Sequence, residues 1–206
     1  MNRTSIKYLT NKTLQYINNK DWYKNSNKLI KDKFKDDHKL FIKLLGVTSP
    51  RNTVKQNTKY AINGYICIKN SIPITFKFGI ANKQITNNVN KVINKEVVGG
   101  QKVNSFIDSL LLIDGSICID VWMLKVFNIK RKSPTAKDIR IIRAKIIKIS
   151  NRLKLKTYEV QGCLWCYAKN ELNGTKHKEY KDFNYYLQKF NGDFIQLTLP
   201  LLIKEI

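Results

Sequence analysis

The chain has 206 residues, of which 43% are hydrophobic and 11% aromatic, enough to bury a core and to argue against general disorder. It carries 38 Lys and Arg residues against 15 Asp and Glu residues, a formal net charge of +23, and such a charge favours a polyanionic partner, with nucleic acid ahead of a membrane surface. The sequence has no apolar run of about 20 residues and no apolar leader, and its four cysteines are too few for a disulfide framework, so we expect a soluble, cytoplasmic protein without a membrane partner.

Two stretches of the chain hold most of the excess charge. Residues 1–60 contain 14 basic and 4 acidic residues, and residues 131–160 contain 10 and 2. In both stretches basic residues alternate with apolar ones, which is typical of a charged surface on a folded body and not of a disordered arm. Lysine greatly outnumbers arginine, and lysine is a point charge suited to phosphate. We therefore expect contacts to a nucleic-acid backbone with little reading of base edges.

Apolar spacing in the first third of the chain is mostly helical. It predicts a helix that begins at Trp22, with Asp21 as its cap, and helical faces that continue to residue 46. Ser49-Pro50 interrupts the pattern, and proline favours the first position of a new helix. Residues 70–79 alternate apolar and polar side chains and are predicted to be extended or a loop.

The middle of the chain is predicted to contain two helical segments around a turn. Helical spacing occurs over 85–93, Gly99-Gly100 favours a tight turn, and residues 103–113 form one apolar helix face. Asp120 directly precedes a further apolar run, as an N-cap residue does. The fold class that follows is mainly α, with room for a few short strands.

The most regular predicted helix begins at Ser133-Pro134, with Ser133 as its cap, and its apolar residues recur at steps of three and four as far as Leu153. A further helix is expected over 160–169. The whole chain, 1–206, is expected to form one domain, with residues 171–206 as a C-terminal extension. Four basic residues flank the regular helix and are candidates for DNA-backbone binding, with a merely solvated face as the alternative: Lys137, Arg140, Lys145 and Lys148.

Lys102 and Asp120 form the constellation that points to chemistry. Lys102 lies at the edge of an apolar helix face and at a helix start, where partial burial and the helix dipole disfavour its ammonium form. A neutral amine is a nucleophile. Asp120 follows eighteen positions later at another helix start, where backbone N–H groups hold a carboxylate ionised. The pair suits attack at a sugar carbon with an oxocarbenium-like transition state, whereas each residue alone could be a surface lysine or a structural cap.

The order of helix, glycine turn, Gln101-Lys102, helix and Asp120 resembles the helix-hairpin-helix DNA glycosylase superfamily, the relatives of endonuclease III and 8-oxoguanine glycosylase. The resemblance implies a helix-hairpin-helix glycosylase-like helical fold. It also implies that Lys102 is the nucleophile that forms a Schiff base and that Asp120 is the activating carboxylate. Gly99, Gly100 and Gln101 would then offer backbone N–H groups to a DNA phosphate.

A closer likeness is to a poorly characterised phage and bacterial branch of these enzymes, over roughly residues 20–170. Its five pieces read here Trp22-Tyr23, Ser49-Pro50…Asn57, Gly100-Gln101-Lys102-Val103-Asn104-Ser105-Phe106, Asp120-Val121-Trp122 and Gln161-Gly162-Cys163-Leu164-Trp165. Val98 stands where the usual hairpin has its first glycine, and the iron–sulfur cysteines of endonuclease III are absent. Cys163 and Cys166 form a single pair, whereas a zinc site needs about four ligands, so no metal and no cofactor is expected.

A glycosylase must take its target base out of the stack and hold it between aromatic or apolar walls. Trp22, Trp122 and Trp165 are candidates for that pocket, with core packing as the alternative for each. Gln161 and Asn57 could read a base edge, or could satisfy buried backbone groups.

The predicted function is a DNA N-glycosylase with AP lyase activity in base excision repair, acting as a monomer on double-stranded DNA that carries a damaged or modified base. The alternatives are a non-catalytic helix-hairpin-helix module that binds DNA or RNA through phosphates, and a nuclease of abasic or branched sites. A nuclease would need a metal-binding cluster of carboxylates, for which the 15 acidic residues offer no clear pattern.

Overall fold

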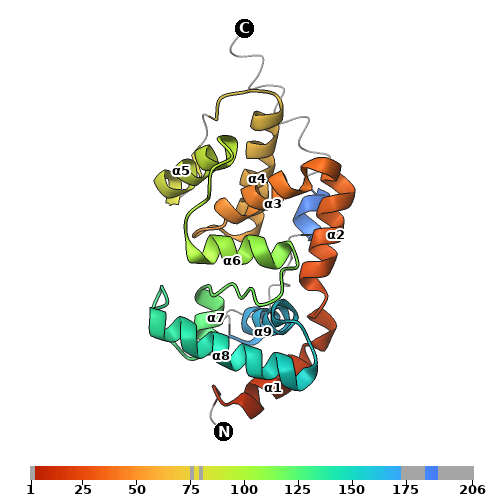
Figure 1. The fold of residues 1–206 in the computed structure, drawn as a ribbon, viewed down its shortest axis with the longest axis vertical. Helices are drawn as coiled ribbons and strands as arrows, with labels where there is room; N and C mark the ends of the chain where they lie inside the picture. The colour runs from red at the N-terminus through yellow and green to blue at the C-terminus, as the bar shows by residue number, and fades with distance from the viewer. Residues whose placement is uncertain (1–2, 75–76, 79–80, 173–183, 190–206) are drawn as a thin grey trace. The chain divides into compact units, whose positions relative to one another are not determined.

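The computed structural model describes residues 3–74, 77–78, 81–172 and 184–189, and these residues are mainly helical and contain no strand (Figure 1). Residue contacts divide the chain into two compact units: unit 1 contains residues 1–42 and 98–180, and unit 2 contains residues 43–97 and 181–206. This division does not test the prediction of one domain, which stays a prediction. The labelled helices are α1 (Ile6–Gln15), α2 (Trp22–Phe34), α3 (His38–Val47), α4 (Val54–Lys69), α5 (Asn82–Ile93), α6 (Gln101–Leu110), α7 (Val121–Val126), α8 (Ala136–Leu153) and α9 (Thr157–Glu171), with short 3-10 turns η1 (Ile17–Asn19) and η2 (Lys35–Asp37). Residues 184–189 are also helical.

Helix α9 is the central element of unit 1, where it contacts α1, α2, α7 and α8 (Figure 1). Its side chains are buried on most sides, as expected of a helix that is apolar nearly all round. Gly162 allows a close approach, because a Cβ built there would lie 3.4 Å from the Asn19 carbonyl oxygen of η1. This packing fixes the start of α2 against the middle of α9.

The core of unit 1 joins α1, α7, α8 and α9 around fully buried aliphatic side chains. The predicted steps of three and four along α8 are confirmed there, because Ile142, Ile146 and Ile149 are each 0% exposed. The same core holds Met123 and Leu124 of α7. Since α7 is only six residues long, this burial rather than intrinsic helix propensity keeps it folded.

Unit 2 contains α4 and α5. Its buried side chains include Leu44, Ala61, Phe78 and Val89, and the Phe78 ring makes an edge contact with Tyr60 at 5.7 Å between centroids. The loop predicted over 70–79 carries no helix or strand at the described positions 70–74 and 77–78.

Two predicted helix starts are wrong by a few residues. Helix α4 begins after Thr53, not at Pro50, and α8 begins after Thr135, not at Ser133-Pro134. In both cases a threonine hydroxyl accepts the backbone N–H three residues later, and the side chain at that third position bonds back to the cap. This reciprocal capping box satisfies two N–H groups at once, which outweighs the preference of proline for a first turn.

Three other features differ from the predictions. Helix α1, capped by the Ser5 hydroxyl, was not predicted. Asp21 stands at the N-cap of α2, but its side chain makes no capping hydrogen bond there among the described residues. Helix α6 ends at Leu110, because Leu112 adopts a positive φ of 62°, and Ile113 lies beyond the helix and is 50% exposed. Most of the predicted extension 171–206 falls outside the described residues.

Candidate functional site

Asp120 is the N-cap of α7, as predicted, and its carboxylate is held by three N–H donors. Oδ1 accepts the backbone N–H groups of Trp122 and Met123, each at 3.0 Å. Oδ2 accepts the indole N–H of Trp165 from α9 at 3.1 Å. A carboxylate has about four acceptor positions, so these bonds fix its orientation and leave one position, on Oδ2, for another group.

Lys102 is the second residue of α6, in unit 1 with Asp120, and its side chain is half-buried, as predicted. The Cys118 thiol donates to the Lys102 carbonyl oxygen, with 3.7 Å between sulfur and oxygen. Burial, together with the charge of Asp120, raises the pKa of the Cys118 thiol to about 12, and the charge of Lys102 partly opposes this rise. Both charged groups therefore lie close enough to act on the same buried thiol.

The tight turn predicted at Gly99-Gly100 is not seen, because residues 96–100 carry no turn, helix or strand. Gly100 is the N-cap with a φ of 99°, a conformation that residues with a Cβ rarely adopt. Since glycine has no side chain, no side-chain cap covers the first N–H groups of α6 among the described residues. Gln101 is exposed at the same end. A helix start of this kind is able to face an anion.

Three predicted tryptophans gather around Asp120. The Trp22 and Trp165 rings lie 5.7 Å apart between centroids, and Trp165 donates to Asp120 while Trp122 follows it in the chain. All three rings are only partly buried. The structure thus brings Trp22, Trp122 and Trp165 together in unit 1, where they form an aromatic surface beside the carboxylate.

Two lysines that sequence reasoning missed belong to the same surface. Lys125 Nζ and Lys169 Nζ each lie 4.1 Å from the centroid of the Trp122 ring, and Lys169 Nζ lies 5.4 Å from that of Trp165. Burial lowers the pKa of Lys169, whereas the charge of Asp120 opposes this lowering. The signal was present in the sequence, because helix positions separated by three or four residues share a face, as do 122 with 125 and 165 with 169.

Of the two roles predicted for Gln161, the structure favours the structural one, because its amide forms hydrogen bonds to buried groups within the protein. Its Oε1 accepts the Cys118 N–H at 3.0 Å, and its Nε2 donates to the Cys118 carbonyl at 3.0 Å and to the Tyr23 hydroxyl at 2.9 Å. Both N–H groups of the amide are used, and the side chain is 2% exposed. The predicted reading of a base edge is therefore not favoured; Gln161 instead holds the chain two residues before Asp120.

Asn57 lies in unit 2 and is also engaged internally, because its Oδ1 accepts the Thr48 hydroxyl at 2.7 Å.

Of the predicted backbone-binding residues on α8, Lys137, Arg140 and Lys148 are exposed. Lys145 differs from them, since its Nζ donates to the Thr4 carbonyl at 2.6 Å and so ties α8 to the N-terminal segment.

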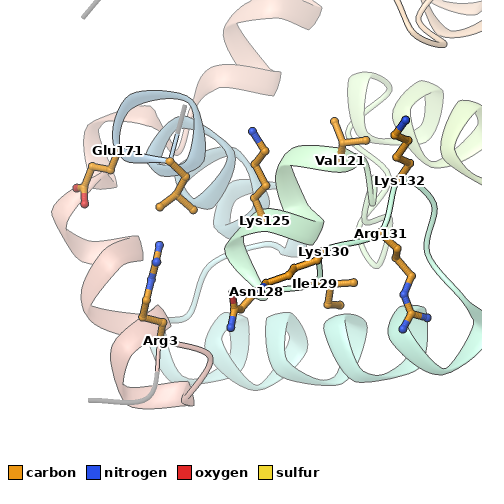
Figure 2. A pocket seen from close by; sticks show the side chains of 10 residues that line it. Arg3, Val121, Lys125, Asn128, Ile129, Lys130, Arg131, Lys132 and Glu171 are labelled. Atoms are coloured by element: carbon orange, nitrogen blue, oxygen red, sulfur yellow. The ribbon is translucent and has the colours of Figure 1, made fainter. Parts of the chain in front are cut away.

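A basic groove of about 640 Å³ lies beside α7 in unit 1 and was not predicted (Figure 2). It contains five cationic side chains and one acidic side chain, together with an amide and three aliphatic residues. Sequence reasoning missed it because the lining comes from three distant parts of the chain. The lining residues are Arg3, Val121, Lys125, Asn128, Ile129, Lys130, Arg131, Lys132, Glu171 and Leu172.

No protein-family model, characterised protein or solved structure matches this chain. Within the described residues, no three or more His, Cys, Asp or Glu side chains come together as a metal site would require. None of the described helices has both the length and the hydropathy needed to cross a bilayer.

Proposed function

We propose that this chain is a DNA N-glycosylase with AP lyase activity, of the helix-hairpin-helix type, in which Lys102 is the nucleophile and Asp120 the activating carboxylate. The observation that carries the proposal is that the starts of α6 and α7 meet at Cys118, whose thiol donates to the backbone carbonyl of Lys102 and lies near enough to both side-chain charges to be affected by them. On this proposal the enzyme acts as a monomer in the cytoplasm, needs no cofactor, and takes duplex DNA with a damaged or modified base.

The reaction begins with the free-base form of Lys102. Its Nζ lone pair attacks the sugar C1′, the new C–N bond forms, and the bond from C1′ to the base breaks with its electron pair leaving on the base, which then takes up a proton. Positive charge develops on the sugar during this step. The Asp120 carboxylate, already oriented by three N–H donors, stabilises that charge without having to reorganise.

A Schiff base follows when Nζ forms a double bond to C1′ as the C1′–O4′ bond breaks and O4′ takes up a proton. In the lyase step a water molecule takes a proton from C2′, a double bond forms between C2′ and C3′, and the C3′–O bond breaks with its electron pair leaving on the 3′ phosphate. The Asp120 oxygen position that the three hydrogen bonds leave available suits the transfer of the proton that Lys102 releases on addition.

The aromatic surface of Trp22, Trp122 and Trp165 supports the same proposal. An enzyme that works on an extruded base needs apolar or aromatic walls for it, and these partly buried rings border Asp120. Gln161 contributes by positioning, because it holds the backbone of Cys118 and thereby the segment that leads to Asp120.

Borohydride trapping on a duplex with an abasic site tests the proposal. The reductant converts a Schiff base into a stable amine, so wild-type protein should give a covalent protein–DNA adduct and Lys102→Ala should give none. Lys169→Ala is the matched control, because Lys169 is a second partly buried lysine in unit 1 and the charge of Asp120 acts on it, and it should retain the adduct.

Two outcomes would overturn the assignment. If Lys169→Ala loses the adduct and Lys102→Ala keeps it, the nucleophile is Lys169. If wild-type protein binds lesion duplexes but gives no adduct and releases no base from any of them, the chain is a non-catalytic nucleic-acid-binding module. In that case Lys102→Ala would lower the slope of log K against log salt by only about 0.9, as the loss of one phosphate contact does.

A further inference from the structure

The loop of residues 128–132, which forms one side of the basic groove, is held in place by the end of α7. Asn128 adopts a left-handed conformation with a φ of 55°. The Ile129 N–H bonds to the Leu124 carbonyl at 2.8 Å and the Asn128 N–H to the Lys125 carbonyl at 3.0 Å. This pattern is a Schellman motif, which ends a helix with a defined exit direction. The cations that follow Asn128 are therefore presented from a fixed backbone.

The single acidic residue of the groove is already neutralised. Glu171 accepts Lys12 Nζ at 2.6 Å, and Lys12 does not line the groove. Arg131 pairs with Asp138 of α8 at 3.1 Å and remains 54% exposed. Lys130 and Lys132 are exposed and have no carboxylate within ion-pair distance among the described residues. The groove therefore presents a strong positive potential to an incoming ligand.

The cations are spread along the groove and do not converge on one point. Figure 2 shows Arg3 at one end, Lys125 in the middle, and Arg131 with Lys132 at the other end. A single phosphate would be held by a few donors around one position, whereas a row of separated cations matches the repeated charges of a phosphodiester chain. The aliphatic lining of the groove offers contact area to sugars or bases: it consists of Val121, Ile129 and Leu172.

The volume of the groove favours a single nucleic-acid strand over a duplex as its ligand. A volume of about 640 Å³ is that of a site for a small ligand. A duplex, in contrast, meets proteins through broad faces of about 1,000–2,500 Å².

We propose that the basic groove seats the phosphodiester backbone of a single, unpaired nucleic-acid strand. Val121, which lines the groove, directly follows Asp120 in the chain, so a bound strand would lie close to the Asp120 carboxylate. The inference does not depend on the chemistry proposed for Lys102 and Asp120, because strand binding and adduct formation are separate measurements.

Fluorescence anisotropy with a labelled oligothymidine, about 12 nucleotides long, tests the inference. The groove variant Lys130→Gln/Lys132→Gln removes two exposed charges, and the matched control Lys83→Gln/Lys95→Gln removes two exposed charges outside the two basic stretches. At physiological salt the groove variant should bind about tenfold more weakly, and its slope of log K against log salt should fall by about 1.4, as expected for two lost contacts to a single strand. The control should change the affinity much less.

Three outcomes would overturn the inference. Equal losses in the groove variant and the control would mean that only the overall charge matters. An equal loss of affinity by the groove variant for a blunt duplex would show that the groove is a duplex contact. Displacement of the oligonucleotide by inorganic phosphate or a mononucleotide at similar concentration would show a small-anion site. The failure of the proposed glycosylase function would be seen separately, as wild-type protein that binds the strand but forms no adduct.

Discussion

The two ends of α7 use charge in opposite ways. At its N-terminus the Asp120 carboxylate is fixed by two backbone N–H groups and one indole. At its C-terminus the side chains of Lys130 and Lys132 extend from a fixed backbone but are themselves exposed. A group that must meet a reacting atom benefits from fixed geometry, whereas contacts to a polyanion require mainly charge. One helix of six residues, about 9 Å long, thus separates a fixed anion from a set of adaptable cations.

The largest expected effect comes from Asp120→Asn. Base release in single-turnover assays should fall by about 10²- to 10³-fold, as on loss of a preorganised electrostatic group. Stability should change by less than about 1 kcal/mol, because asparagine caps helices nearly as well as aspartate, and DNA affinity should remain. Asp108→Asn on α6 is the control, since within the described part of the chain the Asp108 carboxylate accepts a hydrogen bond from the Ser116 hydroxyl alone. If Asp120→Asn releases the base at the wild-type rate, the proposed catalytic role of the Asp120 carboxylate is wrong.

Gln161→Ala should give the largest loss of stability. It leaves the N–H and C=O of Cys118 and the Tyr23 hydroxyl without this partner in a buried site, and each orphaned group costs about 1–3 kcal/mol. We expect the free energy of unfolding to fall by about 3 kcal/mol in urea titrations. Gln101→Ala, at an exposed position, should change it by less than about 0.5 kcal/mol. Similar values for both variants would show that Gln161 does not hold the segment before Asp120.

Lys125→Gln tests whether a strand bound in the groove also contacts α7, close to the aromatic surface. Lys125 lines the groove and also lies over the Trp122 ring. Loss of one strand contact should weaken oligothymidine binding about threefold and lower the salt slope by about 0.7. Lys83→Gln, at an exposed position outside the two basic stretches, serves as the control for the loss of one charge. If both variants bind equally well, the bound strand does not contact Lys125.

The smallest expected effect is a pH dependence of the free energy of unfolding, which comes from Asp114 and should not involve either end of α7. Burial alone would raise the pKa of Asp114, but hydrogen bonds from Thr157, Lys156 and Gly115 lower it below its usual value. A carboxyl whose pKa is lower in the folded state stabilises the fold at neutral pH, and this contribution is lost as the pH falls through that folded-state pKa. It should be below about 1 kcal/mol, since the side chain is half-exposed.

Urea midpoints measured from pH 7 down to pH 3 check this prediction. Wild type should be the more stable protein at neutral pH, and its advantage over Asp114→Asn should disappear in acid. A constant difference across the range would contradict the stabilising role of the Asp114 hydrogen bonds.

Local sequence signals predicted the elements around Asp120 because those elements are fixed by local interactions. An acidic residue before an apolar run predicted the cap of α7, and the apolar steps along α8 predicted its buried face. The starts of α4 and α8 differ from the predicted ones because a Ser-Pro pair precedes each true start, which is set by a threonine three residues before a side-chain acceptor. In both cases the capping box is the stronger local signal.

Features made by tertiary packing could not be predicted in the same way. The basic groove depends on Arg3, the end of α7 and the end of α9 coming together, and no local pattern reports that. The role of Gln161 is similar, because its partners Tyr23 and Cys118 are distant in the chain. An isolated glutamine in a helix carries no sign of which backbone group it will meet.

The amide of Gln161 does for Cys118 what a neighbouring β-strand would do, since it bonds to both the N–H and the C=O of one residue. The segment Ser116–Ile119 is buried and carries no helix, strand or turn, and a side chain from a helix supplies these two hydrogen bonds. The position of this segment along α9 therefore depends on a single side chain. Deletion of Ile119 would leave the hydrogen bonds between Gln161 and Cys118 intact but would turn the Asp120 carboxylate, at the start of α7, away from Trp165.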